Sequence, residues 1–237
     1  MSGFSIAVLA GGLGTRIQGV SGPTPKALIE LAGRPFLDWK LDQLVLSRPS
    51  AIYLLVGQGA AEIFEHVSKR DYGVPVALIH DGPHLRGTAG AVLSAASAIS
   101  GDGFVLTYGD NLLDFPLEVL VEEAIRTGLS TMVATSAVGP SDAPNLEIEE
   151  NKIISYVSGG RSDLTFVDYG YSWLWKRDVP DPSSDFEHLG ALWSQLSSSK
   201  RLGAVTTNQA YSEIGTPEGL AQSRDAIIRR SNEELSL

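Results

Sequence analysis

An apolar run that leads directly into a glycine-rich turn constrains this chain more than any other stretch. Residues 6–9 are Ile-Ala-Val-Leu, a composition typical of a buried strand. Three glycines, a threonine and an arginine follow: Gly11, Gly12, Gly14, Thr15 and Arg16. Glycine lets consecutive N–H groups form a concave anion site, and an adjacent arginine adds a planar, multidentate donor. The stretch therefore predicts a phosphate-binding loop after the first strand.

The charge around this loop favours the same kind of ligand. Lys26 adds a second positive charge ten residues after Arg16, and residues 1–29 contain no acidic side chain. The whole chain of 237 residues nevertheless has a formal net charge of −10. A cationic segment in an acidic protein indicates a local site for phosphate.

Two well-known phosphate loops do not match this stretch. A P-loop with its glycines at Gly14 and Gly19 would need lysine where Val20 stands. The dinucleotide fingerprint begun at Gly12 would need glycine at Ile17, which disfavours a dinucleotide-dependent oxidoreductase. The loop is therefore of another kind.

The order of motifs from the first strand onward resembles that of a known enzyme family. Residues 9–16 are followed by Pro25-Lys26 and by Gly-Arg-Pro-Phe-Leu at 33–37. This series resembles the signature of the sugar-1-phosphate nucleotidyltransferases, and the similarity extends over nearly the whole chain. The resemblance implies an NTP and a sugar 1-phosphate as substrates, an NDP-sugar and pyrophosphate as products, and Mg²⁺ as cofactor.

Residues 33–37 and the Gly-Thr-Ala-Gly-Ala stretch at 87–91 look most like heptose- or mannose-1-phosphate guanylyltransferases, which favours GTP. Uridylyl-, thymidylyl- and cytidylyltransferases of the same family remain alternatives. A nucleotide-sensing module without turnover is another, although it is disfavoured by the presence of Arg16, Lys26 and Asp110.

Apolar strand-like and helix-like segments alternate in the first part of the chain. Strands are expected at 6–9, 51–56, 74–79, 104–107 and 130–137, and helices from Pro35, at 60–67, 88–99 and 117–125, with 27–29 extended. Such alternation predicts βαβ units, and hence an α/β fold with a Rossmann-like, mostly parallel sheet and helices on both faces.

The pattern changes beyond Pro140. A hairpin is expected at 146–149 and 153–157, a strand at 166–175, a helix at 186–196, an extended piece at 202–206 and a last helix from Thr216 to Ile228. We expect the hairpin to be an insertion over the carboxyl edge of the sheet, where ligands of open α/β folds bind. We treat 1–237 as a single domain, with a nucleotide-binding half at about 1–138 and a sugar-binding half with the last helix at about 139–237.

Composition excludes several other classes of protein. Cysteine is absent, which excludes disulfides, zinc–thiolate sites and cysteine nucleophiles. A pI near 4.8 argues against a nucleic-acid-binding surface. The uncharged stretch 87–101 is too short and too rich in small residues to cross a membrane, and no signal peptide is visible. We expect a cytoplasmic protein without nucleic-acid or membrane partners, and a homodimer is compatible with the sequence.

The resemblance assigns the catalytic residues Arg16, Lys26 and Asp110. Arg16 would hold the β- and γ-phosphates that leave as pyrophosphate, and Lys26 would bridge the α-phosphate and the sugar phosphate. Asp110, after an expected strand, would ligate Mg²⁺, which usually takes one or two protein carboxylates. Glu213 would be the second ligand, at a position where the family commonly has aspartate.

The remaining assignments concern the two substrates. Nucleotide contacts are expected from Ala10, Gly11, Gly12, Gly14, Thr15, Arg16, Lys26, Asp81, Gly87 and Thr88, and sugar contacts from Asn111, Asp168 and Glu187. Relatives place a base-reading side chain just before the loop at 87–90, so the resemblance implies that Asp81 reads the base. We expect guanine, because a carboxylate can accept from its adjacent N1–H and N2–H₂ groups. The alternative is that Asp81 only opens an Asp-Gly turn. Asp168 stands where relatives often carry asparagine, and the family's Glu-Lys-Pro segment is missing, with residues 158–160 near that point.

Overall fold

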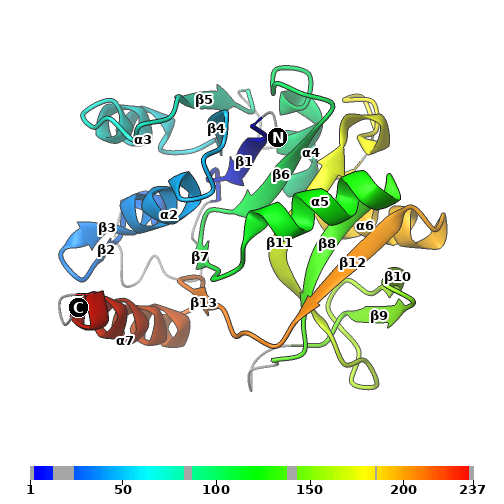
Figure 1. The fold of residues 1–237 in the computed structure, drawn as a ribbon. Helices are drawn as coiled ribbons and strands as arrows, with labels where there is room; N and C mark the ends of the chain where they lie inside the picture. The colour runs from blue at the N-terminus through cyan, green and yellow to red at the C-terminus, as the bar shows by residue number, and fades with distance from the viewer. Residues whose placement is uncertain (1–2, 13–23, 83–86, 138–142, 185, 235–237) are drawn as a thin grey trace.

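A computed structural model describes residues 3–12, 24–82, 87–137, 143–184 and 186–234. Within them the main sheet has nine strands in the order β5-β4-β1-β6-β11-β8-β12-β10-β9 (Figure 1). Their bounds are β1 Ser5–Leu9, β4 Ala51–Val56, β5 Val76–His80, β6 Gly103–Tyr108, β8 Ser130–Thr135, β9 Leu146–Glu149, β10 Lys152–Tyr156, β11 Val167–Trp175 and β12 Leu202–Thr207. Two short pairs lie outside this sheet: β2 Glu30–Leu31 with β3 Arg34–Pro35, and β7 Asn111–Leu112 with β13 Ser212–Glu213.

Most strands of the sheet run in one direction. β5, β4, β1 and β6 are parallel neighbours, and β8 is parallel to β12. β11 lies between β6 and β8 and is antiparallel to both. The parallel strands therefore end at one common edge of the sheet, where open α/β folds bind ligands.

Helices cover both faces of the sheet, as the sequence predicts. They are α2 Phe36–Val45, α3 Ala60–Val67, α4 Gly87–Ala95, α5 Leu117–Thr127, α6 Leu189–Ser198 and α7 Pro217–Glu234, with 3₁₀ turns at η1 Lys26–Leu28 and η2 Lys176–Asp178. Side chains of α2, α3 and α5 share one hydrophobic core with one face of the sheet, and those of α4 and α6 share a second core with the other face. β1 lies between the two cores: Ile6 and Val8 belong to the first and Ala7 to the second, which explains why its sequence is continuously apolar.

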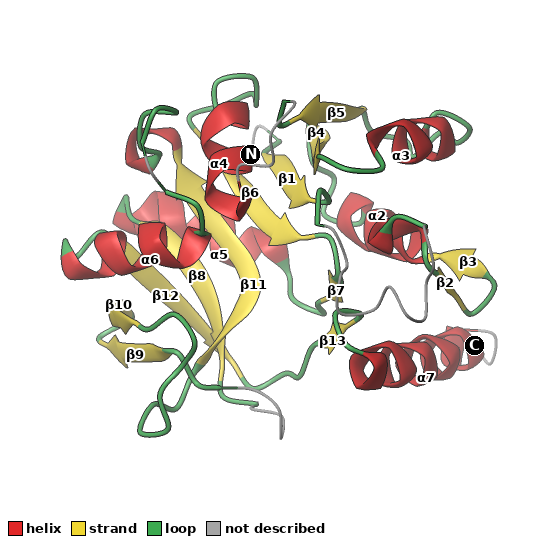
Figure 2. Cartoon of the chain, turned by 180° about the vertical axis from the view of Figure 1, so that it is seen from behind, coloured by secondary structure: helices red, strands yellow, loops and turns green. Residues whose placement is uncertain are grey.

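The last helix packs away from the main sheet. In Figure 2, α7 lies beside β2 and β3 and apart from the nine strands. Leu220 and Ile227 of α7 form a small third core with residues of the 29–36 segment. No helix of the described chain is long and apolar enough to cross a membrane.

Several expected elements differ from the observed ones. The extended conformation expected at 27–29 is wrong, because Leu28 N–H donates to the Pro25 carbonyl at 2.8 Å and closes the η1 turn. The regular part of α4 ends at Ala95 rather than at residue 99, and α7 extends beyond Ile228 to Glu234. The helix expected from residue 186 begins at Leu189, because the residues before it connect α4 with α6, as described below.

The expected hairpin forms and continues the sheet beyond β12. Lys152 of β10 pairs with Gly203 of β12, and the hairpin packs against α6. At its open end, Leu146 N–H donates to the Phe166 carbonyl at 3.0 Å. The hairpin therefore forms the last two strands at one lateral side of the sheet. Its open end, at Leu146, reaches the residue before β11.

Candidate active site

The ends of β1, β4 and β6 approach each other closely at the carboxyl edge of the sheet. A Cβ on Gly11 would lie 2.8 Å from the Gly57 nitrogen, and one on Gly109 would lie 2.7 Å from the Leu9 carbonyl oxygen. Backbone packing therefore requires glycine at both positions. Around Gly12, no described atom lies within 4 Å of where a Cβ would be. Packing against the described residues does not require glycine there, which is compatible with a backbone that faces a ligand.

Three residues of the expected phosphate loop, Gly14, Thr15 and Arg16, lie outside the described residues. Ala10 is described and buried, and its N–H donates to the Leu55 carbonyl at 2.8 Å. The backbone N–H of Ala10 is thus already occupied within the sheet.

Lys26 and Asp110 form an ion pair at this edge. Lys26 Nζ donates to Asp110 Oδ2 at 2.6 Å, across 84 residues of sequence. The Asp110 side chain is 38% exposed, whereas that of Lys26 is 16% exposed. A carboxylate open to solvent and a positive charge beside it can together receive a metal ion and phosphate oxygens.

The short β7–β13 pair brings Glu213 to the same place. Glu213 lies opposite Asn111 in this pair, and Ile214 N–H donates to the Asp110 carbonyl at 2.8 Å. The Glu213 carboxylate accepts hydrogen bonds from Gly215 N–H and, at 2.8 Å, from the Thr216 hydroxyl. Glu213 thus also holds the start of α7.

These two carboxylates fit the donor set that Mg²⁺ requires. Mg²⁺ takes one or two protein carboxylates and completes its shell with water and phosphate oxygens. The described residues contain no group of three or more His, Cys, Asp and Glu arranged to hold a metal ion. The site therefore suits a metal ion that is bound together with a phosphorylated substrate rather than in a protein cage.

Asp81 directly follows β5, and one of its carboxylate oxygens accepts no hydrogen bond from the described residues. Its N–H donates to the Val56 carbonyl at 3.1 Å, and its side chain is 8% exposed. Oδ1 is buried without a hydrogen-bond partner among the described residues. The following N–H, that of Gly82, donates to His80 Nδ1 at 3.0 Å rather than to Asp81. An Asx turn opened by Asp81 would need the N–H of the residue two positions on, which is Pro83 and has none. Asp81 Oδ1 lies 4.0 Å from His80 Nδ1 and accepts no hydrogen bond from the described residues.

Gly87, Thr88 and Glu187 come together between α4 and α6. Gly87 has φ +71°, and a Cβ there would collide with the Glu187 carbonyl oxygen. Ala89 N–H donates to the same carbonyl at 3.2 Å, and Leu189 N–H donates to Thr88 Oγ1 at 3.1 Å. The contacts of these residues thus join the two helices, while the Glu187 side chain itself is exposed.

Asp168 lies at the start of β11 among aromatic residues. Its carboxylate accepts from Gly170 N–H at 2.8 Å and from the Tyr156 hydroxyl at the end of the hairpin. Burial raises the pKa of Asp168 to about 6. Burial also raises the pKa of Tyr108, whose phenol feels the Asp168 charge. Asp168 is thus a carboxyl group that holds its proton in mildly acidic solution.

Lys40 was not among the residues predicted from the sequence, and it is completely buried beneath the site. Its ammonium group donates to Thr107 Oγ1 at 3.0 Å and to Asn111 Oδ1 at 2.9 Å, and lies 5.0 Å from the centre of the Tyr171 ring. Burial lowers the pKa of Lys40 to about 7, although the negative charge of Asp110 opposes this shift. The signal was present in the sequence, because position 40 falls on the apolar stripe of α2 that includes Leu37 and Leu44.

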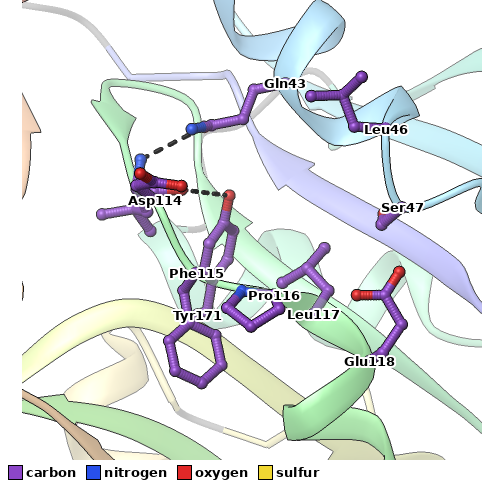
Figure 3. Close-up of a pocket in the computed structure, with 10 residues that line it drawn as sticks. Gln43, Leu46, Ser47, Asp114, Phe115, Pro116, Leu117, Glu118 and Tyr171 are labelled. Atoms are coloured by element: carbon purple, nitrogen blue, oxygen red, sulfur yellow. Dashed lines mark hydrogen bonds between the residues drawn. The ribbon is translucent and has the colours of Figure 1, made fainter.

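Asn111 is also buried, with 6% of its surface exposed, and its carbonyl oxygen is taken by Lys40. The chain then continues through Leu113, whose N–H donates to Gln43 Oε1 at 3.3 Å. A pocket of about 240 Å³ lies beside this segment (Figure 3). It is lined by Gln43, Leu46, Ser47, Leu113, Asp114, Phe115, Pro116, Leu117, Glu118 and Tyr171, a set that includes none of the expected site residues.

Comparison with known protein families identifies the domain. The model of the MobA-like NTP transferase domain matches residues 6–144, more than half of the chain. The chain belongs to this family. The matched part of this NTP transferase domain includes the glycine-rich turn, Lys26, Asp81 and Asp110.

Curated relatives of this NTP transferase differ in the nucleotide that their names give. The chain is 26% identical to a putative mannose-1-phosphate guanyltransferase of Sulfolobus acidocaldarius over 74% of its own length and 49% of the relative. It is 33% identical to the UTP–glucose-1-phosphate uridylyltransferase AglF of Haloferax volcanii over 48% of its length and 46% of the relative. The chain thus spans about half or less of these relatives.

A solved structure matches the fold over nearly its full length. The crystal structure of HddC from Yersinia pseudotuberculosis has a TM-score of 0.79 and 24% identity, and the match covers 94% of this chain and 99% of that one. At this identity the match establishes the fold of the NTP transferase.

Proposed function

We propose that this protein is a sugar-1-phosphate nucleotidyltransferase, which makes an NDP-sugar and pyrophosphate from an NTP and a sugar 1-phosphate. The observation that carries the proposal is the Lys26–Asp110 pair at the carboxyl edge, beside the glycine-rich turn and with Glu213 next to it. In this reaction an oxygen of the sugar phosphate bonds to the α-phosphorus while the bond to the β-phosphate oxygen breaks. No protein nucleophile is needed, so catalysis depends on positioning and charge neutralisation.

Each charged group has a defined task in this proposal. Mg²⁺ would neutralise phosphate oxygens when it is bound to Asp110, with Glu213 as the second ligand. Lys26, released from Asp110, would contact the α-phosphate and the sugar phosphate. Arg16, which lies outside the described residues, would hold the phosphates that leave.

We propose GTP as the preferred NTP on the basis of Asp81. Its buried Oδ1 has no hydrogen-bond partner among the described residues, although His80 Nδ1 lies 4.0 Å away. Asp81 follows β5 next to the end of β4 and the Gly11 turn. Guanine offers two adjacent donors, N1–H and N2–H₂, to such a carboxylate. Uracil and thymine would place a carbonyl oxygen against it, and an unpaired buried acceptor is costly.

For the sugar we propose a heptose or mannose 1-phosphate bound near Asn111, Asp168 and Glu187. The nucleotide would then contact residues of about 1–138 and the sugar those of about 139–237, while the buried Asn111 side chain stays bound to Lys40. We further propose that the enzyme acts in the cytoplasm. A homodimer would be compatible with this activity.

The test is an assay of every combination of NTP and sugar 1-phosphate. Purified protein with Mg²⁺ is incubated with GTP, UTP, dTTP, CTP or ATP and with mannose, glucose or heptose 1-phosphate, and pyrophosphate release is measured. We expect release that depends on both substrates and is fastest with GTP. Binding of GTP without release in any combination would instead favour a nucleotide-sensing module, and release with UTP, dTTP or CTP at a higher kcat/KM would refute the guanine assignment.

A further inference from the structure

Lys40 joins two positions on either side of Asp110. Thr107 lies three residues before Asp110 and Asn111 one residue after it, and both side chains accept a hydrogen bond from the Lys40 ammonium. The turn between them cannot shift freely, because Gly109 N–H donates to the Leu9 carbonyl at 2.9 Å and its Cα packs against that carbonyl. The Asp110 backbone is therefore held by β1 on one side and by Lys40 on the other.

A second side chain of the same helix extends this contact. Gln43 lies three residues after Lys40, on the same face of α2, and accepts the Leu113 N–H. Figure 3 shows Gln43 reaching the segment that follows Asn111. Helix α2 thus holds the chain at three points between residues 107 and 113.

The position of Lys40 is costly for a helix that only packs against a sheet. Its neighbours on the same face are Leu37, Leu41 and Leu44, and complete burial disfavours an ammonium ion. An apolar residue would remove this cost but would leave the buried Asn111 oxygen without its donor. Asn111 Nδ2 faces Gly170 of β11, where even a Cβ would collide with it, so the amide fills its site tightly.

We propose that Lys40 is a positioning residue that fixes the Asp110 carboxylate in the geometry needed to bind the metal–nucleotide complex. Lys40 acts through Thr107 and Asn111 and does not contact substrate. This inference rests on the proposed role of Asp110. Partners of metal ligands that act in this way typically contribute 10- to 100-fold to metal affinity or activity.

The test compares Lys40→Met with a control variant that also loses buried hydrogen bonds. Methionine keeps the length and apolar stem of lysine and removes the ammonium group. The control is Ser130→Ala, because Ser130 is also completely buried and donates to Asp178 Oδ2 at 2.6 Å, at the opposite end of its strand from the site. Both variants are expected to lower the melting temperature.

Two measurements separate positioning from structural support. Hydrogen exchange of the backbone amides between residues 108 and 113 should accelerate in Lys40→Met but not in Ser130→Ala. Electron paramagnetic resonance titration with Mn²⁺ and a non-hydrolysable GTP analogue should show about 10-fold or more weaker metal binding in Lys40→Met alone. In the pyrophosphate assay, kcat should fall and the Mg²⁺ requirement should rise in Lys40→Met. Ser130→Ala should keep the wild-type kcat and Mg²⁺ requirement.

Unchanged hydrogen exchange and unchanged Mn²⁺ affinity in Lys40→Met would overturn the proposal, whatever its melting temperature. If Lys40→Met does not fold, the same measurements are made on Thr107→Val, because this variant keeps the lysine and removes one of its two acceptors. This variant should show the same changes to a smaller degree, and wild-type Mn²⁺ affinity in it would overturn the proposal. A wild-type protein without nucleotidyl transfer or Mn²⁺ binding would refute the role of Asp110, whereas the exchange measurement would still report on the Lys40 contacts.

Discussion

Replacing Asp168 with asparagine should stabilise the protein, and the gain should depend on pH in a defined way. Burial raises the pKa of Asp168 from 3.8 to about 6 in the folded protein. The stability that the protonated carboxyl supplies is complete below pH 4, near the unfolded-state pKa, and is lost as the pH rises through about 6. Two pKa units correspond to up to about 3 kcal/mol of unfolding free energy. Asparagine carries no charge and therefore avoids this loss.

The local hydrogen bonds can survive this substitution. Asparagine keeps an oxygen that accepts the Gly170 N–H, and the Tyr156 hydroxyl can rotate to accept from the new amide. The difference in stability between the variant and the wild type should thus isolate the charge. It should be smallest near pH 4, grow up to about pH 6 and stay constant above it.

Urea denaturation of both proteins at unit steps from pH 4 to pH 8 measures this difference. The control is Asp163→Asn, because Asp163 is exposed and the Arg161 guanidinium holds the pKa of its carboxyl below the usual range. That control should lose stability relative to the wild type above pH 4, which is the opposite sign. A difference between Asp168→Asn and the wild type that stays constant from pH 4 to pH 8 would refute the raised pKa of Asp168.

Substitutions at three further residues test the proposed site. Lys26→Ala should leave the melting temperature nearly unchanged and lower kcat by roughly 100-fold or more, as expected for the loss of one transition-state charge contact; near-normal turnover would remove Lys26 from catalysis. Glu213→Gln keeps an acceptor for the start of α7 and removes the charge. The Mg²⁺ concentration for half-maximal rate should therefore rise with little loss of stability. Glu213→Ala should raise it as well and also cost roughly 1 kcal/mol of unfolding free energy. If both follow the wild-type Mg²⁺ titration, Glu213 is not a ligand. Asp81→Asn should reduce the kcat/KM preference for GTP over UTP by about 10-fold or more, and an unchanged ratio would return Asp81 to the turn.

Local patterns in the sequence determined most elements of the fold. The strand at 51–56 and the helix at 60–67 have the expected bounds, because an apolar run and a helical repeat are properties of consecutive residues. The alternation of such segments was sufficient to predict an α/β fold with helices on both faces. The glycine-rich turn was also recognisable, since close backbone approach restricts Gly11 to glycine whatever the ligand.

Tertiary structure alone decided which of these residues meet. The Lys26–Asp110 pair spans 84 residues, and Glu213 reaches it through a pair of two-residue strands too short to leave a pattern. Strand direction was equally hidden, because β11 has the composition of a buried strand whether it runs parallel or antiparallel to β6.

Lys40 shows most clearly what the sequence alone does not determine. A lysine within the apolar stripe of α2 signals an anomaly, yet the sequence does not say what its ammonium group contacts. Only the packing of α2 against the end of β6 supplies Thr107 and Asn111 as acceptors. Contacts of this kind depend on the arrangement of distant segments in space, and the periodicity of either segment carries no information about the other.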